Sequence, residues 1–145
     1  MDGAEPAFTA TSTVIRDDWK TATGASLGLR AAVHLLTFTA VPDQPGFGDL
    51  VTILDLPWDG EIVRMGQVTD WAAVVDFAAA ADVPDRDRRM IAMAAGYAGG
   101  PPVDLEAAVG FAGDPAAAQR VIEAFAIATG HGDRWELTER PAPSA

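Results

Sequence analysis

The stretch from Asp114 to Gly130, DPAAAQRVIEAFAIATG, carries the clearest structural signal in the sequence. Asp114 can accept hydrogen bonds from the free amides of a first helical turn. Pro115 follows it, and the fixed φ of proline suits the first position of a helix. Gly130 can adopt the left-handed conformation that commonly ends one. Together these residues predict a helix over residues 115–129.

This predicted helix is amphipathic, with one apolar and one polar face. The apolar residues recur at helical spacing and are expected to face the core: Val121, Ile122, Phe125 and Ala128. The polar residues are expected to lie opposite: Gln119, Arg120 and Glu123. One face of the helix should therefore be buried against the rest of the chain.

Four more segments begin near serine, threonine or aspartate, and most of them end at glycine or proline, as helices do. They cover residues 26–39, 71–81, 85 to about 98, and 105–112. The residues predicted to line the buried faces of the first three are Leu29, Ala32, Leu35, Leu36, Trp71, Val74, Val75, Ala78, Met90, Met93, Ala94 and Tyr97. Their many alanines leave the helices slim enough to pack closely.

Residues 50–68 allow two interpretations. A two-residue turn at Asp59-Gly60 pairs the flanking residues symmetrically about that turn. The register puts two apolar pairs on one face and an opposite-charge pair on the other, namely Leu54–Met65, Leu56–Val63 and Asp55–Arg64. The alternative is a helix over residues 47–56, because Phe47, Val51 and Leu54 also fit helical spacing. Clustered Val, Ile and Thr favour the hairpin, and the Thr- and Val-rich residues 7–15 could add a third strand.

These segments predict a mainly α fold of about five packed helices, with one β-hairpin inserted between the first and the second; an α+β fold is the alternative. The chain has 145 residues, 49% of them hydrophobic, which suffices for a core without disulfides or a structural metal. Residues 7–139 are expected to form a single globular domain. Residues 1–6 and 140–145 are expected to be flexible tails, because their composition cannot bury enough apolar surface.

The charge of the chain narrows the possible partners. It has 21 acidic and 10 basic residues, for a formal net charge of −11. Nucleic acids and anionic membranes are held by clustered cations, so neither is expected as a direct partner. An acidic surface attracts basic proteins instead, although net charge also serves solubility alone.

The sequence lacks the features that several kinds of site, a membrane span or a signal peptide would require. The sequence contains no cysteine, so disulfides, thiolate metal sites and cysteine nucleophiles are excluded. It has no phosphate-binding loop, dinucleotide fingerprint or nucleophile elbow, and we predict no cofactor. No apolar run approaches the roughly 20 residues that span a bilayer, and the acidic start, MDGAE, is unlike a signal peptide. A cytoplasmic location is therefore expected.

Two histidines are the candidates for proton transfer near neutral pH. His34 lies at the edge of the apolar face of the first predicted helix, one turn after Arg30, and the two could orient an anionic or carbonyl group. Asp55 is a further candidate if it faces a cleft rather than Arg64. The structural alternative is that His34 is a boundary residue with one satisfied hydrogen bond.

His131 follows the helix predicted over residues 115–129 and stands just before Asp133 and Arg134. An imidazole, a carboxylate and a guanidinium so close together could form an acid/base cluster. The structural alternative is that Gly130 ends the helix and His131 lies at its negative end. His131 and Asp133 are too few ligands for a metal site, so no metal is predicted.

Two further segments have both a functional and a structural interpretation. The run DRDRR at residues 85–89 could bind a phosphate at a helix start, but its own aspartates favour a salt-bridged, exposed turn. Met90, Met93, Tyr97 and Trp71 could line an adaptable groove for an apolar ligand, although methionines at helical spacing usually pack in the core.

The sequence favours binding as the function: a small acidic protein that recognises a basic partner protein or an apolar small molecule. The first alternative is a metal-independent enzyme with His34 or His131 as base and Arg30 or Asp55 orienting a compact metabolite. Such an enzyme should gather His34, Asp55 and Arg30 around one enclosed cavity, whereas an interaction module should not. A weaker alternative is a nucleic-acid-mimicking inhibitor. Alanine-rich helical faces also permit a homodimer.

Overall fold

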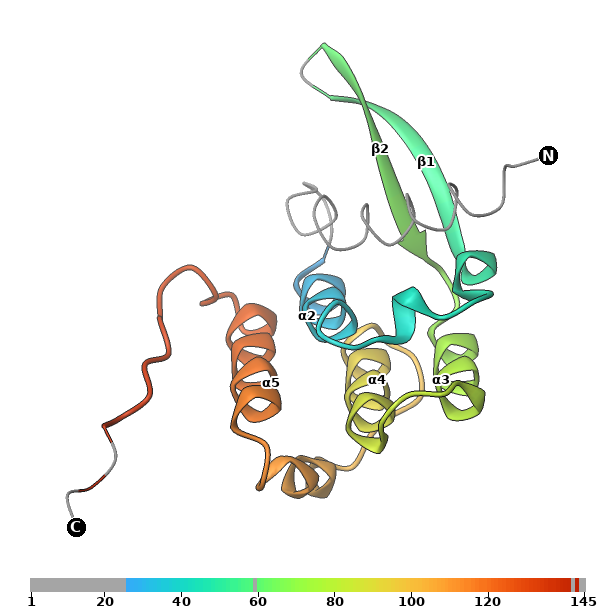
Figure 1. Ribbon diagram of the computed structural model, residues 1–145. Coiled ribbons are helices and arrows are strands. Elements are labelled where there is room, and N and C mark those ends of the chain that lie inside the picture. Colours follow the sequence, from blue (N-terminus) through green and yellow to red (C-terminus); the bar gives the residue numbers. More distant parts are fainter. Residues whose placement is uncertain (1–25, 59, 142, 144–145) are drawn as a thin grey trace.

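The structure is a computed structural model that describes residues 26–58, 60–141 and 143. Four α-helices, three short 3-10 helices (η) and one two-stranded sheet make up this part of the chain (Figure 1). In chain order the elements are α2 (Leu27–Leu36), η3 (Val41–Asp43), η4 (Phe47–Leu50), β1 (Val51–Trp58), β2 (Glu61–Val68), α3 (Trp71–Ala80), α4 (Asp85–Tyr97), η5 (Leu105–Phe111) and α5 (Pro115–Ala128).

The predicted fold class is confirmed: the fold is mainly α, and the hairpin lies between the first and second predicted helices. Local capping explains why the helices begin where they do. The side chains that accept hydrogen bonds from a first helical turn are Ser26 before α2, Asp70 before α3, Asp104 before η5 and Asp114 before α5. Gly130 has a φ of 85°, the left-handed conformation that ends α5. Within the described residues, no helix is long and apolar enough to cross a bilayer.

The strands β1 and β2 pair in the predicted register, from Val51 opposite Val68 to Trp58 opposite Glu61. The alternative helix over residues 47–56 is wrong, because the helical turn η4 stops at Leu50 and Val51 is already extended, with a φ of −117°. Val51 and Val68 are buried at the base of the hairpin, which projects from the helical body (Figure 1). The third strand expected at residues 7–15 lies outside the described residues.

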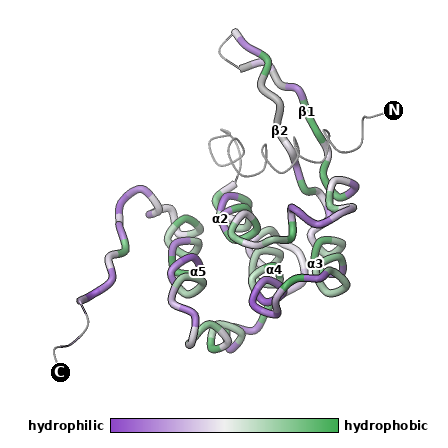
Figure 2. Tube along the Cα trace, in the orientation of Figure 1, coloured by the Kyte–Doolittle hydropathy of each residue, from purple (hydrophilic) through white to green (hydrophobic). Residues whose placement is uncertain are grey.

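The core forms around α2, which packs against both α4 and α5, while α3 packs against α4 (Figure 1). Hydrophobic residues are concentrated on these helices, and the segment after α5 is largely hydrophilic (Figure 2). The fully buried residues of α2 and α4 are Ala31, Ala32, Val33, Leu35, Leu36, Met90, Ile91, Ala94 and Ala95. Gly28 allows the two helices to approach closely, because a Cβ there would collide with the carbonyl oxygen of Tyr97.

The face of α5 that packs in the core is only partly the predicted one: Val121 and Ala128 pack against the core, but the two largest predicted residues do not. Ile122 and Phe125 were expected to be buried but are 53% and 61% exposed. Ala117 and Ala124 are fully buried in their place. Their small side chains let α5 approach α2 closely, and the separation of packed helices depends on the side chains at their contact.

Polar contacts to α2 hold α5 in this rotation. Glu123 and Arg120, both expected on the solvent side, bond instead to His34, on α2. When Glu123 faces α2, Phe125 points away from it, because two positions along a helix turn the side chain by roughly 200°, almost to the opposite face. Close approach of Ala117 and Ala124 and the polar contacts to His34, rather than the hydrophobicity of single side chains, decide which face of α5 is buried.

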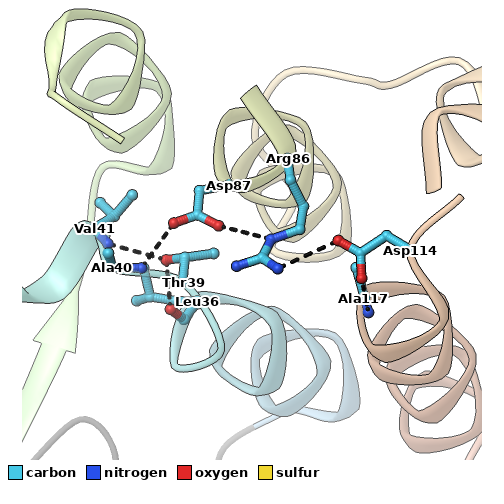
Figure 3. Close-up of polar contacts among 8 residues, drawn as sticks. All are labelled: Leu36, Thr39, Ala40, Val41, Arg86, Asp87, Asp114 and Ala117. Carbon is cyan, nitrogen blue, oxygen red and sulfur yellow. Dashed lines mark hydrogen bonds and ion pairs between the residues drawn. The ribbon is translucent and has the colours of Figure 1, made fainter. Parts of the chain in front are cut away.

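Asp87 in the first turn of α4 carries a carboxylate that is almost completely buried, with only 1% of the residue exposed. Its Oδ2 accepts a hydrogen bond from the backbone N–H of Ala40 at 2.9 Å, and its Oδ1 accepts one from Nε of Arg86 at 3.2 Å (Figure 3). Arg86 also donates from Nη1 to Oδ2 of Asp114, the cap of α5, at 3.3 Å. This network joins the chain after α2 to the first turns of α4 and α5.

The DRDRR run is therefore salt-bridged as predicted, but it is not an exposed turn. Arg88 donates to Asp85 at 2.6 Å and to the carbonyl oxygens of Ala78 and Ala81 at the end of α3. Asp87 points inward, where the Ala40 amide and the Arg86 guanidinium compensate its charge. Arg86 and Arg88 therefore tie α4 to α5 and to the end of α3.

We expect Asp87→Ala to destabilise the fold by about 3–5 kcal/mol, because it leaves the Ala40 amide and the Arg86 guanidinium without their buried partner. The measurement is the free energy of unfolding from urea titrations. Asp85→Ala is the matched control on the same helix turn, since Asp85 is exposed and its loss should change stability by less than about 1 kcal/mol. Equal effects of the two substitutions would contradict the structural role of Asp87.

Candidate functional site

His34 projects from α2 toward α5 and forms a close pair with Glu123. Its Nε2 lies 2.8 Å from Oε1 of Glu123, and the His34 side chain is 13% exposed. Gln119, one turn earlier on α5, donates to the other carboxylate oxygen of Glu123 at 3.3 Å. His34 is one of the two candidate histidines of the sequence, and its partner comes from a helix 89 residues further along the chain.

Arg120 makes a second set of polar contacts between α5 and the end of α2. Its Nε donates to the backbone carbonyl oxygen of His34 at 2.7 Å, and its Nη2 donates to Oγ1 of Thr37 at 3.0 Å. Its guanidinium carbon also lies 5.8 Å from the ring centre of Phe38, within reach of a cation–π contact. Arg120 thus donates to the carbonyl of His34 in the last turn of α2 and positions the backbone there.

Burial and the neighbouring charges shift the pKa values of this cluster in opposite directions. Burial alone would raise the pKa of Glu123, but hydrogen bonds from His34 and Gln119 and the nearby charges outweigh it, so this pKa lies below its usual value of 4.5. Burial lowers the pKa of Arg120, and the charge of Glu123 opposes that effect in part. Arginine keeps its proton at any physiological pH, so the interface holds an ionised carboxylate and a guanidinium side by side.

A hollow of about 540 Å³ lies against this cluster, between α5 and the chain that follows it. A second hollow, of about 490 Å³, adjoins it toward the start of α5. The two share Gln119, Ile122 and Leu137 in their walls. We call this continuous depression the α5 trench; α5 forms one wall and residues 132–139 the other.

The lining of the α5 trench brings several large apolar side chains together on an open surface. Large hydrophobic side chains line it while remaining exposed: Ile122 at 53%, Phe125 at 61%, Trp135 at 60% and Leu137 at 39%. Three glutamates also line it, namely Glu123, Glu136 and Glu139. The trench therefore combines an apolar floor with carboxylates.

The other predicted catalytic residues do not gather at His34. Arg30 lines a small neighbouring hollow, which shares Ile127 and Gly132 with the α5 trench but does not include His34. Asp55 lies in β1 opposite Arg64, as the predicted register requires, and away from the wall of the α5 trench. His131 stacks on Trp135 with ring centres 4.8 Å apart. An enzyme was expected to have His34, Arg30 and Asp55 around one cavity. Of these three residues, only His34 lines the trench.

The residues proposed for an apolar groove lie mainly in the core. Met90 is fully buried, and Met93 and Trp71 are 7% and 5% exposed. Tyr97 is half-buried, and burial raises the pKa of its hydroxyl. Their positions agree with the structural interpretation of a methionine stripe, which is core packing.

Metal binding has no support from clustered ligands. Among the residues that the structure describes, no group of three or more His, Asp or Glu side chains could hold an ion.

Sequence reasoning missed the residues that form the α5 trench. Ile122 and Phe125 were assigned to the core, and Trp135 and Leu137 received no role. The sequence does contain a relevant signal. The helix carries polar residues at 119, 120 and 123 next to alanines, so a face of small residues competes with the larger apolar face for burial.

Comparison with known proteins supplies no relative from which a function could be carried over, since no protein-family model, no curated protein and no solved structure matches the chain.

Because the pKa of Glu123 is lower in the folded chain than its ordinary value of 4.5, its ionised form stabilises the fold above about pH 4.5. That contribution is lost as the pH falls through the folded-state pKa. We therefore expect Glu123→Gln to be less stable than wild type at neutral pH, with a gap that shrinks as the pH drops below about 4.5. The side chain is about a third exposed, so the gap should stay below about 1 kcal/mol.

Urea midpoints of both proteins, measured from neutral pH down to about pH 3, test this pH dependence. Glu106→Gln, at an exposed position of η5, serves as the control for loss of one negative charge. A difference between Glu123→Gln and wild type that does not change with pH would show that the ionised carboxylate is not the stabilising group.

Proposed function

We propose that this chain is an interaction protein whose α5 trench binds a basic, amphipathic segment of a partner protein. The observation that carries the proposal is the line of exposed apolar side chains in one depression, with Phe125 and Trp135 the largest. Single exposed hydrophobic residues need no explanation, but a contiguous set in a hollow marks an interaction site.

The shape of the trench suits a helix. It follows α5 from Pro115 to Ile127, and a helix of the 14 residues in α5 is about 21 Å long. A partner helix of similar length can lay its apolar face along Ile122 and Phe125, which is the helix-in-groove mode of recognition. Aromatic side chains at the centre of such a site usually carry much of the binding energy.

The charge of the trench favours a basic partner. Glu123, Glu136 and Glu139 line it, and the net charge of the chain is −11. The wall also contains one guanidinium, that of Arg120, so three carboxylates against one cation leave an excess of negative charge. Complementary charge accelerates encounter and selects the partner more than it adds affinity.

An apolar small molecule, the other ligand that the sequence suggests, fits less well. Small-molecule sites bury most of their ligand's surface, whereas Phe125 and Trp135 stay more than half exposed here. The open, elongated trench therefore supports a peptide over a compact apolar ligand.

The His34–Glu123 pair supports a second candidate, an enzyme with histidine acid/base chemistry. A carboxylate hydrogen-bonded to an imidazole is the pairing that orients a histidine base, and this pair lines a hollow of about 540 Å³. We rank it second because Arg30 and Asp55 do not line that hollow. Native mass spectrometry that finds a compact metabolite on the purified protein, lost in His34→Gln, would reverse the ranking.

The binding proposal predicts a preference between two synthetic probes. One is a fluorescent 14-residue amphipathic helix of leucine and lysine, and the other is its twin with glutamate for every lysine. We expect the lysine peptide to bind at least about 10-fold more tightly in fluorescence anisotropy, and to weaken as salt is added. We expect Phe125→Ser to weaken its binding at least about 10-fold, because the central apolar anchor is lost.

Leu105→Ser is the matched control, since Leu105 is 82% exposed but lies on η5, outside the lining of the trench. It should leave the affinity for the lysine peptide unchanged. The proposal fails if the glutamate twin binds equally well, if Phe125→Ser binds like wild type, or if Leu105→Ser is as damaging as Phe125→Ser.

A further inference from the structure

A second surface, separate from the α5 trench, lies on the outer half of the hairpin. Within the described residues the sheet has two strands only, so no third strand lies beside β2 there. The hairpin projects from the helical body, and Ile62 near its tip is 70% exposed (Figure 1). A two-stranded ribbon is marginally stable in water by itself, and an exposed apolar edge strand is a template for pairing.

The register decides which amides face outward. The closing pair of a two-residue hairpin loop, Trp58 and Glu61, is hydrogen-bonded, and hydrogen-bonded and open pairs then alternate along an antiparallel ladder. The pairs Pro57–Ile62 and Asp55–Arg64 are therefore open pairs, whose backbone groups point away from the partner strand. Pro57 agrees with this assignment, because proline has no N–H and is tolerated only where the ladder does not need one.

The two edges of the ribbon differ in what they offer. On the outer half of β1, Pro57 has no amide hydrogen, so of the two outward-facing positions there, Pro57 and Asp55, only Asp55 offers a donor. On β2, both Ile62 and Arg64 carry amides and carbonyls that point outward, next to an exposed apolar side chain. The outer half of β2 is the edge fitted for strand addition.

We propose that the outer edge of β2 binds an extended segment of a partner protein, in which lysine or arginine alternates with apolar residues. Its backbone would pair with Ile62 and Arg64, and its apolar residues would cover Ile62. The hairpin segment, residues 51–68, contains three acidic residues against one arginine, in a chain of net charge −11. A second copy of this chain carries the same excess of negative charge and is disfavoured as the occupant.

Amide hydrogen exchange followed by NMR tests the proposal, with a heptapeptide of alternating lysine and valine as the probe. In the free protein the outward amides of Ile62 and Arg64 should exchange faster than the inward amides of Val63 and Met65. Saturating peptide should slow the exchange of Ile62 and Arg64 at least about 10-fold. A twin peptide with glutamate for lysine should have no such effect.

Two variants separate the backbone edge from the side chain. Arg64→Pro removes an outward amide without removing a ladder donor, as Pro57 does on β1, and should abolish the slowing at Ile62. Arg64→Ala also loses the guanidinium but keeps the amide, and should retain the effect. Slow exchange at Val63 and Met65 verifies that the hairpin is intact in both variants.

The outcomes that would overturn the proposal are distinct. Protection of Ile62 in the free protein at every concentration would mean that another part of this chain covers the edge. Protection that rises with protein concentration would identify a second copy as the occupant. No slowing at millimolar peptide, or equal loss in Arg64→Ala and Arg64→Pro, would rule out strand addition. Phe125→Ser should not change the hairpin result, so this test and that of the α5 trench fail independently.

Discussion

The buried carboxylate of Asp87 constrains the whole helical body. A charge in an apolar interior is tolerated only when hydrogen bonds and an opposite charge compensate it. Its partners come from two places, the amide of Ala40 after α2 and the guanidinium of Arg86, which in turn reaches the cap of α5. Satisfying this one group therefore ties the chain between α2 and η3 to the first turn of α4 and, through Arg86, to the cap of α5. The network holds the ends of these helices in place. Between those ends, alanine and glycine residues allow the helices to make close contact.

The same constraint explains why α5 turns a polar side toward the core. With its first turn held at Arg86 by Asp114, the helix presents Arg120 and Glu123 to α2, where the His34 side chain and backbone receive them. Ala117 and Ala124 fill the remaining contact. The bulky Ile122 and Phe125 are then left on the outside, where with the chain after α5 they form the α5 trench. The proposed binding surface is thus a consequence of a polar helix–helix interface.

Both proposed surfaces combine exposed apolar side chains with negative charge, but they use different backbone chemistry. The α5 trench offers side chains from a helix whose own backbone hydrogen bonds are satisfied, so its partner must be recognised by its apolar face and its charge. The edge of β2 offers backbone donors and acceptors, so a partner there is recognised by its extended conformation. An acidic chain with two such surfaces is suited to a basic partner that contacts it at more than one place.

The elements themselves could be predicted from the sequence because local interactions specify them. A capping side chain bonds to an amide two or three residues ahead, as Asp104 and Asp114 do, and hairpin register follows from the turn and the alternation of residues on either side. The tertiary structure alone decided which face of α5 is buried and which residues meet. His34 and Glu123 are 89 residues apart, and Ala40 and Asp87 are 47 apart. Such pairs depend on how whole helices pack, where close approach of alanines and compensation of buried charge outweigh the hydrophobicity of single side chains.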